Sequence, residues 1–202
     1  AVHTAYQYSS MERELNDRGD IVAERYFDPQ GLPAVSNAGY AQVRKQYDLA
    51  RREVYAEYLG RRDLPILIGQ GYAAVRTEYD ALGNIVRRRF FGMAGEPING
   101  AAGYAEVVRE YDELGNLLEE RYLDKDGRGV AIAGDAFAFA RYAYDSKGNQ
   151  TYAAYFDGDG NPVNCNGGYA AVERAYDGRR LVGERYTDAR GNPAVIAAGY
   201  SR

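Results

Sequence analysis

An internal repeat constrains this chain more than any other feature of its 202 residues. The string Gly-Tyr-Ala, found at Gly71 and again at Gly103, recurs with a spacing of about 32 residues. Aligning the chain on this string predicts one repeat array over 7–198, preceded by a short N-terminal segment and followed by the start of a truncated further unit. These parts are 1–6, then the six units 7–38, 39–70, 71–102, 103–135, 136–167 and 168–198, and finally 199–202.

The repeat explains an unusual aromatic composition, in which 20 Tyr stand against 6 Phe and no Trp. When the first residue of each unit, usually Gly, is numbered one, aromatic residues recur at positions two and twenty, and Tyr recurs at position nine. Position two holds Tyr8, Tyr40, Tyr72, Tyr104, Phe137 and Tyr169, and position twenty holds Tyr26, Tyr58, Phe90, Tyr122, Tyr155 and Tyr186.

Two turn motifs separate the strand-like segments of each unit. The first is Tyr-Asp-x-x-Gly-Asn, as at 79–84, and the second is Asp-x-x-Gly-x-Pro, as at 28–33. Both are typical of hairpin turns, because Asp accepts hydrogen bonds from the amides that follow it and Gly adopts the left-handed backbone conformation. The segments between them are rich in Val, Ile and Tyr, which indicates β-strands.

The two motifs also predict which residues are buried. If the first turn closes Asp against Gly, position nine faces position fourteen, and alternation places positions five, nine, sixteen and twenty on one apolar face. Positions six and nineteen, such as Arg44 and Arg25, then lie on a charged, solvated face. One hairpin cannot bury its own apolar face, so neighbouring units must stack. The sequence therefore predicts an all-β fold, an elongated solenoid of stacked β-hairpin repeats.

The tandem Tyr-Asp-x-x-Gly-Asn motifs, at 79–84, 111–116 and 144–149, resemble the YD repeats of the Rhs family. In that family β-hairpins coil into large shells around toxic cargo. The architecture also resembles the choline-binding and glucan-binding cell-wall repeats, in which tandem aromatic-rich hairpins hold ligands between rungs. Both resemblances imply a bacterial protein that is secreted or attached to the cell envelope, and they imply no particular ligand.

Charge and residue types argue against several classes of function. A net charge of −4 offers no general cationic field for nucleic acid. His3 and Cys165 are the only residues of their kinds, too few for a zinc site or a Ser-His-Asp arrangement. The acidic stretches 124–128 and 157–161 raise the question of calcium, but turn formation accounts for them better. We therefore expect no catalytic residue, no metal and no cofactor.

The hydropathy of the chain and its first residues bear on where in or outside the cell the protein is located. No run of about 18 apolar residues is present, so we expect no membrane insertion. The first residues do not have the pattern of a signal peptide, which leaves a cytoplasmic location open. The resemblances favour an extracellular or cell-surface location.

The candidate binding residues are aromatic and cationic. Position two lies outside the strands, where a tyrosine could stack on a sugar ring or anchor a partner, although packing between adjacent rungs is the favoured interpretation. In the unit 39–70, Arg51 and Asp63 replace the two turn glycines, and the arginines nearby could dock an acidic glycan or a phosphate-bearing polymer. The candidates are Tyr40, Tyr72, Tyr104 and Tyr169, with Arg51, Arg52, Arg61 and Arg62.

The unit 136–167 departs from the others in its aromatic residues. Alternation places Phe137 and Phe139 on the same side, either in a tighter local core or in an exposed partner site. Cys165 is expected to be a small filler of the core.

These observations predict a non-catalytic repeat module that binds cell-envelope or extracellular carbohydrate, with a protein partner as the second possibility. The alternative is a structural spacer or shell, or a protein–protein scaffold, within a larger secreted bacterial protein.

Overall fold

The fold is all-β, as the sequence predicts. A computed structural model describes residues 7–196, which contain twelve antiparallel strands and no helix. The strands are hydrogen-bonded in chain order, so each lies beside its sequence neighbours. They are β1 (Ser10–Leu15), β2 (Ile21–Phe27), β3 (Gln42–Tyr47), β4 (Glu53–Leu59), β5 (Ala74–Tyr79), β6 (Ile85–Phe91), β7 (Glu106–Tyr111), β8 (Leu117–Leu123), β9 (Phe139–Tyr144), β10 (Gln150–Phe156), β11 (Ala171–Asp177) and β12 (Arg180–Thr187).

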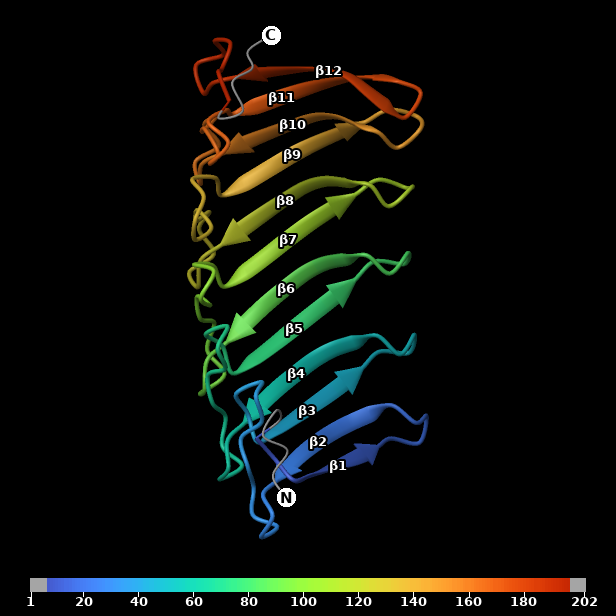
Figure 1. The fold of residues 1–202 in the computed structure, drawn as a ribbon, viewed down its shortest axis with the longest axis vertical. Helices are drawn as coiled ribbons and strands as arrows, with labels where there is room; N and C mark the ends of the chain where they lie inside the picture. Colours follow the sequence, from blue (N-terminus) through green and yellow to red (C-terminus); the bar gives the residue numbers. More distant parts are fainter. Residues whose placement is uncertain (1–6, 197–202) are drawn as a thin grey trace. The chain divides into compact units, whose positions relative to one another are not determined.

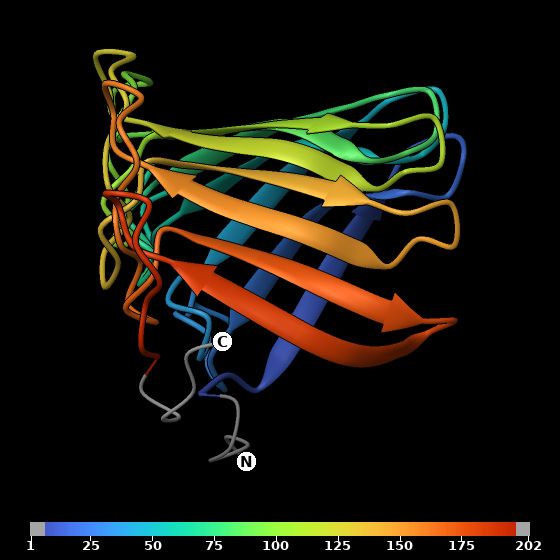
Figure 2. The same ribbon diagram turned by 90° about the horizontal axis from the view of Figure 1, so that it is seen from above.

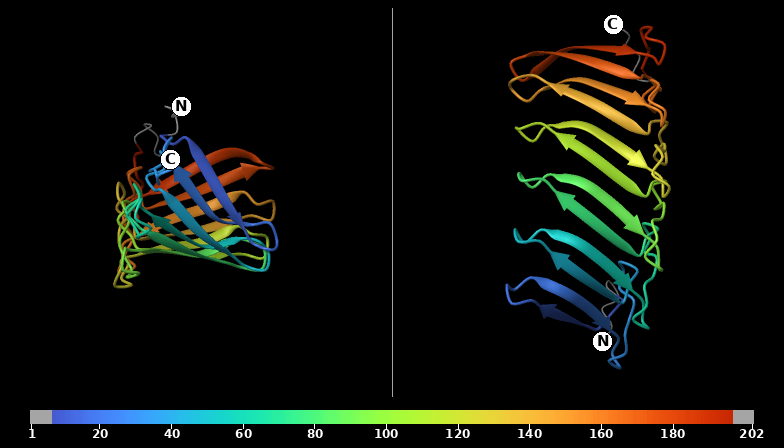
Figure 3. Two further views of the ribbon diagram at one scale, coloured as in Figure 1. Left: turned by 90° about the horizontal axis from the view of Figure 1, so that it is seen from below. Right: turned by 180° about the vertical axis from the view of Figure 1, so that it is seen from behind.

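The chain divides into two compact units. Among the described residues, the first unit contains 7–78 together with 88–101, and the second contains 79–87 together with 102–196. In the first unit, β1 to β4 form two hairpins whose following loops lie on the same side (Figure 1 and Figure 3). In the second, the loops after β8, β10 and β12 lie side by side at one edge, opposite the short hairpin turns (Figure 2). The predicted stack of hairpins is confirmed, and each of the six sequence repeats contains one hairpin.

The short hairpin turns form because an aspartate satisfies the backbone that follows it. In the turn between β7 and β8, Asp112 Oδ1 accepts hydrogen bonds from the amides of Leu114 (2.9 Å) and Asn116 (2.8 Å). The Asn116 side chain donates to Asp112 Oδ2 at 2.8 Å. Gly115 has a φ of 81°, a left-handed conformation that favours glycine. The turn closes with its own residues.

The strand register differs by one residue from the prediction. Position nine faces position fifteen rather than fourteen, as in the pairs Tyr47–Glu53 and Tyr111–Leu117. A β-bulge beside the turn leaves position sixteen without a direct partner, as at Val54 and Leu118, whereas position twenty remains on the buried face, as at Tyr122 and Tyr186. The prediction that position sixteen belongs to the core is therefore wrong at Leu118 and Val182, which are 37% and 55% exposed.

The core is assembled from successive hairpins. One buried cluster in the second unit joins Val107 and Tyr122 of one hairpin to Phe137 and Ala140 of the next. The following cluster again combines residues of two hairpins, among them Ala153 and Val172. No hairpin in these clusters buries its apolar face alone, which explains why the repeats stack.

The two phenylalanines of the unit 136–167 lie in different clusters, so the prediction that they share a side is wrong. Phe137 packs against Tyr122 and Tyr155, whereas the ring of Phe139 stacks on Phe156 at 4.7 Å. Strand β9 begins only at Phe139, so strand alternation does not extend back to Phe137. Both residues are buried, as expected for a tighter local core, and Cys165 packs beside the Phe137 cluster.

Replacing Val172 by Ala should lower the free energy of unfolding by roughly 2 kcal/mol, because it removes two fully buried methyl groups and leaves a cavity. Urea denaturation followed by circular dichroism measures this loss. Val195→Ala is the matched control, since Val195 is exposed and its truncation should cost less than about 0.5 kcal/mol. Equal losses in the two variants would show that position five is not a core position.

Candidate functional site

The aromatic residues of positions two and twenty form a continuous row within each unit of the structure. Tyr26, Tyr58, Tyr122 and Tyr155, all at position twenty, each pack between the position-two rings of their own hairpin and of the next. In the first unit the row runs through Tyr8, Tyr26, Tyr40, Tyr58, Tyr72 and Phe90, with ring centroids 4.5–6.1 Å apart. In the second it runs through Tyr104, Tyr122, Phe137, Tyr155, Tyr169 and Tyr186, with centroids 4.8–6.1 Å apart. We call this feature the aromatic row.

The four candidate tyrosines of position two belong to the aromatic row. Tyr40, Tyr72, Tyr104 and Tyr169 are all half-buried, and their ring neighbours in the row come from position twenty, two for Tyr40, Tyr72 and Tyr169 and one for Tyr104. The hydroxyl groups also bond within the row, as between Tyr26 and Tyr40. These side chains connect one hairpin to the next, and the rings do not stand free at the mouth of a groove.

Backbone hydrogen bonds run beside the aromatic row and connect the same hairpins. The carbonyl of Ala41, at position three, accepts from the amide of Tyr26 in the preceding hairpin (2.9 Å). The Ala41 amide donates to the carbonyl of Leu59 in its own hairpin (2.9 Å). Ala138 and Ala170 repeat this pattern in the second unit, with distances of 2.7–2.8 Å. These alanines are almost completely buried, so the close approach requires a small side chain.

Burial changes the acidity of the tyrosines in the row. Desolvation raises the pKa of Tyr58 to about 12, and nearby Tyr72 adds to the shift. Desolvation, followed by a hydrogen bond to Glu184, raises the pKa of Tyr186 to about 12. In both cases the neutral phenol is favoured because a phenolate would be poorly solvated there.

The protein should lose stability as pH rises above about 10. The unfolded tyrosines release their protons near their ordinary pKa of about 10, whereas folded Tyr58 and Tyr186 hold theirs until about 12. The unfolded state therefore binds fewer protons in this window and is favoured. Melting temperatures between pH 8 and pH 11.5, with tyrosinate absorbance recorded in parallel, test this expectation. Full ionisation of all tyrosines near pH 10 without unfolding would contradict it.

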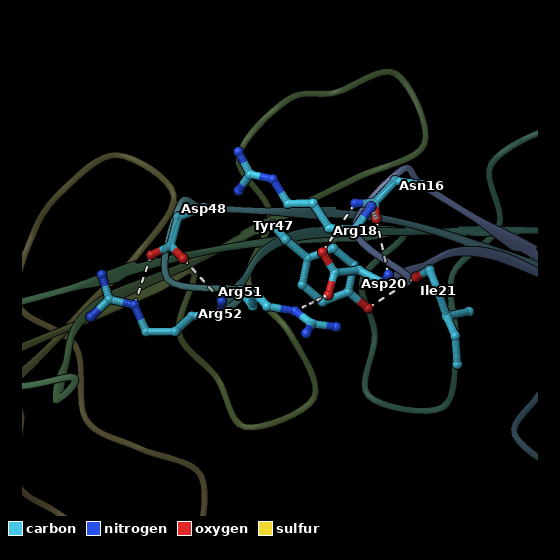
Figure 4. A network of polar contacts seen from close by, with 8 residues as sticks. All are labelled: Asn16, Arg18, Asp20, Ile21, Tyr47, Asp48, Arg51 and Arg52. Carbon is cyan, nitrogen blue, oxygen red and sulfur yellow. Dashed lines mark hydrogen bonds and ion pairs between the residues drawn. The ribbon is translucent and has the colours of Figure 1, made fainter.

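The first two hairpin turns are joined by an ion pair (Figure 4). Asp20 occupies position fourteen, where Asn84, Asn116 and Asn149 stand in later turns, and Asn16 occupies the position of the usual Asp. Arg51 replaces the turn glycine of the next hairpin with a φ of 63°, and its Nε donates to Asp20 Oδ1 at 2.6 Å.

The surroundings of Asp20 account for its acidity. Hydrogen bonds from Asn16 and Arg51 hold the pKa of this buried carboxyl below its usual value. Asn16, Asp20 and Arg51 therefore depart from the common turn residues together, and the ion pair between Asp20 and Arg51 compensates for the lost glycine. We call these three residues the compensated set.

The four candidate arginines do not form a single patch. Arg51 and Arg52 lie at the turn before β4, where Arg52 Nε contacts Asp48 Oδ2 at 2.7 Å. Arg61 and Arg62 lie at the turn after β4, and both are exposed. The seven residues of β4 separate the two pairs by roughly 20 Å. Arg51 pairs with Asp20 of the preceding turn, and Arg52 pairs with Asp48 of its own turn.

Restoring the common residues at Asp20 and Arg51 tests the compensated set. Asp20→Asn alone should lower the urea midpoint, because Arg51 keeps its left-handed backbone and loses its partner. Adding Arg51→Gly should recover most of that loss, because glycine adopts the conformation without strain. The exposed pair Arg185 and Glu173, 3.9 Å apart, is the control and should show little coupling. Additive losses at Asp20 and Arg51 would contradict the coupling.

In the described residues, the carboxylates of the two acidic turns accept hydrogen bonds from the backbone of their own turns. Asp124 Oδ1 accepts from the amides of Asp126 and Arg128, and Asp157 Oδ1 accepts from those of Asp159 and Asn161, all at 2.9–3.0 Å. These bonds hold the pKa of both carboxyls below the usual value. Within residues 7–196 no group of three or more His, Cys, Asp or Glu side chains is arranged to hold a metal ion. His3 and the predicted truncated unit 199–202 lie outside the described residues.

A search of the described residues finds no helix with the length and apolarity needed to cross a bilayer.

Comparisons with known proteins give likenesses only among solved structures. No protein-family model matches the chain, and no curated protein does. A mutant form of the Photorhabdus luminescens Tc holotoxin pore is 14% identical, with 88% of this chain and 10% of that chain covered and a TM-score of 0.45. A TcdB2-TccC3-TEV structure is 13% identical, with 96% and 12% covered and a TM-score of 0.37. This chain therefore spans about a tenth of the length of those chains. Tandem aromatic-rich hairpins, the architecture of YD repeats, are present throughout the described residues.

Proposed function

We propose that this chain is a non-catalytic structural segment, a scaffold that forms part of a larger assembly and contacts other proteins. The aromatic row supports this proposal most directly. Its side chains, including Tyr40 and Tyr169, are used to join one hairpin to the next. A repetitive surface held in this way keeps its charged face and turn tips at fixed spacing within a unit, which suits a scaffold.

The same proposal holds that residues 7–196 carry no reaction centre. The conspicuous carboxylates recur at turn positions, where Asp112 and Asp145 bind the amides of their own turns. Catalytic groups normally converge once in one pocket. An extracellular or cell-surface location also belongs to this proposal.

Hydrogen exchange tests whether the hairpins are coupled as a scaffold requires. The amides of Tyr122 and Tyr155 bond the position-three carbonyls of the next hairpin at 2.8 Å. They should exchange as slowly as amides paired inside one hairpin, because both open only when the stack opens. Exchange as fast as that of the exposed turn amides would show that neighbouring hairpins separate freely and would overturn the scaffold proposal.

Carbohydrate binding through the position-two tyrosines, the first prediction from the sequence, remains a separate prediction. A variant with Tyr40, Tyr72, Tyr104 and Tyr169 changed to Phe retains the rings of the aromatic row and removes their hydroxyls. Retention on insoluble wall polysaccharides by the native chain, lost in this folded variant, would favour carbohydrate binding over a purely structural role.

A further inference from the structure

Two adjoining cavities lie between the first two hairpins, on the charged face of the first unit. The larger has a volume of about 410 Å³ and the smaller about 170 Å³, and Arg25 of β2 lines both. The larger volume falls within the ~300–1,000 Å³ of ordinary small-molecule sites. Besides Arg25, the lining residues that matter for binding are Glu14, Tyr55 and Glu57 in the larger cavity and Phe27, Arg61 and Asp63 in the smaller.

The smaller cavity is cationic. Its one carboxylate, Asp63, is neutralised by Arg44, whose Nη2 lies 2.7 Å from Asp63 Oδ2. Arg25 makes only a long contact of 3.4 Å with Glu14. Within residues 7–196 no hydrogen bond or ion pair engages the Arg61 guanidinium. The Arg61 guanidinium therefore remains for a ligand, and Arg25 has further N–H groups besides the one on Glu14. Guanidinium groups bind carboxylates in a two-pronged geometry.

The second unit shows that this cationic cavity is not a general property of the repeat. At position four, where the first unit has Gln42 beside the cavity, the fifth hairpin has Phe139, whose ring stacks on Phe156. Arg121 occupies the same position as Arg25, but its guanidinium lies 4.4 Å from the centre of the Phe139 ring. In the second unit the corresponding guanidinium of Arg121 therefore packs on an aromatic ring of the protein, whereas Arg25 lines a cavity.

The larger cavity presents both hydrogen-bond donors and acceptors. Glu14 and Glu57 offer carboxylate oxygens, and Tyr55 offers a ring and a hydroxyl group. Sugar hydroxyls donate and accept at once, so this mixture suits them, and a tyrosine ring can pack on a sugar face. Arg44 and Lys45 also line this cavity, but each already pairs with a carboxylate, Arg44 with Asp63 at 2.7 Å and Lys45 with Glu53 at 2.9 Å. The carboxylates of an acidic peptide would therefore lie near Glu14 and Glu57, which costs electrostatic energy.

We propose that the two cavities form a binding site for an acidic oligosaccharide. Arg25 and Arg61 hold the carboxylate of one uronic acid residue in the smaller cavity, and the hydroxyls of the adjoining sugar bond Glu14, Glu57 and Tyr55 in the larger. Of the four arginines predicted from the sequence, only Arg61 takes part, and its partner Arg25 comes from the preceding hairpin. The site goes beyond the scaffold function and does not depend on it.

Isothermal titration of the full chain with trigalacturonate at low salt tests this site. The fully methyl-esterified trisaccharide is the neutral control ligand and should bind at least tenfold more weakly, because it lacks the charge that Arg25 and Arg61 recognise. Arg61→Ala should weaken trigalacturonate binding about tenfold or more. Arg62→Ala, which removes the same charge from the same turn outside the cavity, should change the affinity less than about twofold.

Three results would overturn the proposal. These are the absence of measurable trigalacturonate binding by the native chain, equal losses in Arg61→Ala and Arg62→Ala, and binding of a triglutamate peptide at least as tight as that of the sugar. Thermal unfolding of both variants must first match that of the native chain, which is expected because both side chains are exposed. Hydrogen exchange between hairpins does not depend on this site, so the scaffold proposal and the sugar site can fail separately.

Discussion

The packing of position-twenty rings against the position-two rings of successive hairpins is the interaction on which the rest of each compact unit depends. A two-stranded hairpin has too little apolar area to remain folded in water, and the aromatic row supplies that area from its neighbours. The row also explains the small residue at position three, since Ala41 and Ala138 must let two backbones approach within hydrogen-bonding distance. The packing of the core, the path of the loops and the backbone hydrogen bonds between hairpins therefore all depend on the same ring contact, which is repeated along each unit.

Most of the fold could be predicted from the sequence because the same turn motifs recur in most repeats. Asp and Gly at fixed spacing determine where the chain reverses, and the alternating Val and Tyr residues determine the strands. Turn chemistry of this kind predicts a bulge into the next strand, but not how the bulge shifts the register, so the sequence places Leu118 and Val182 in the core although both are partly exposed. Phe139 shows a related limit, since alternation applies only after the strand has begun.

The binding residues were less predictable than the fold. Arg51 and Arg61 look alike in the sequence, yet Arg51 pairs with Asp20 in the preceding turn, whereas Arg61 lies beside a cavity. The exchange of Asn16 and Asp20 relative to the other turns is a visible signal that could have marked Arg51 as an internal partner. No comparable signal marks Arg25, because its role depends on which residue occupies position four of the next hairpin. Such contacts between hairpins become visible only when the register is known.

The aspartate-closed turns have a consequence for how such an array can change over evolutionary time. Asp112 and Asp145 bond only residues of their own turns through the oxygens described above, so the residues at the tips contribute little to closing the turn. Leu82, Leu114 and Lys147 occupy one equivalent tip position, and both leucines are more than half exposed. Mutations can therefore alter this rim while the interior is conserved, and a single backbone design can present many different outer edges to a changing environment.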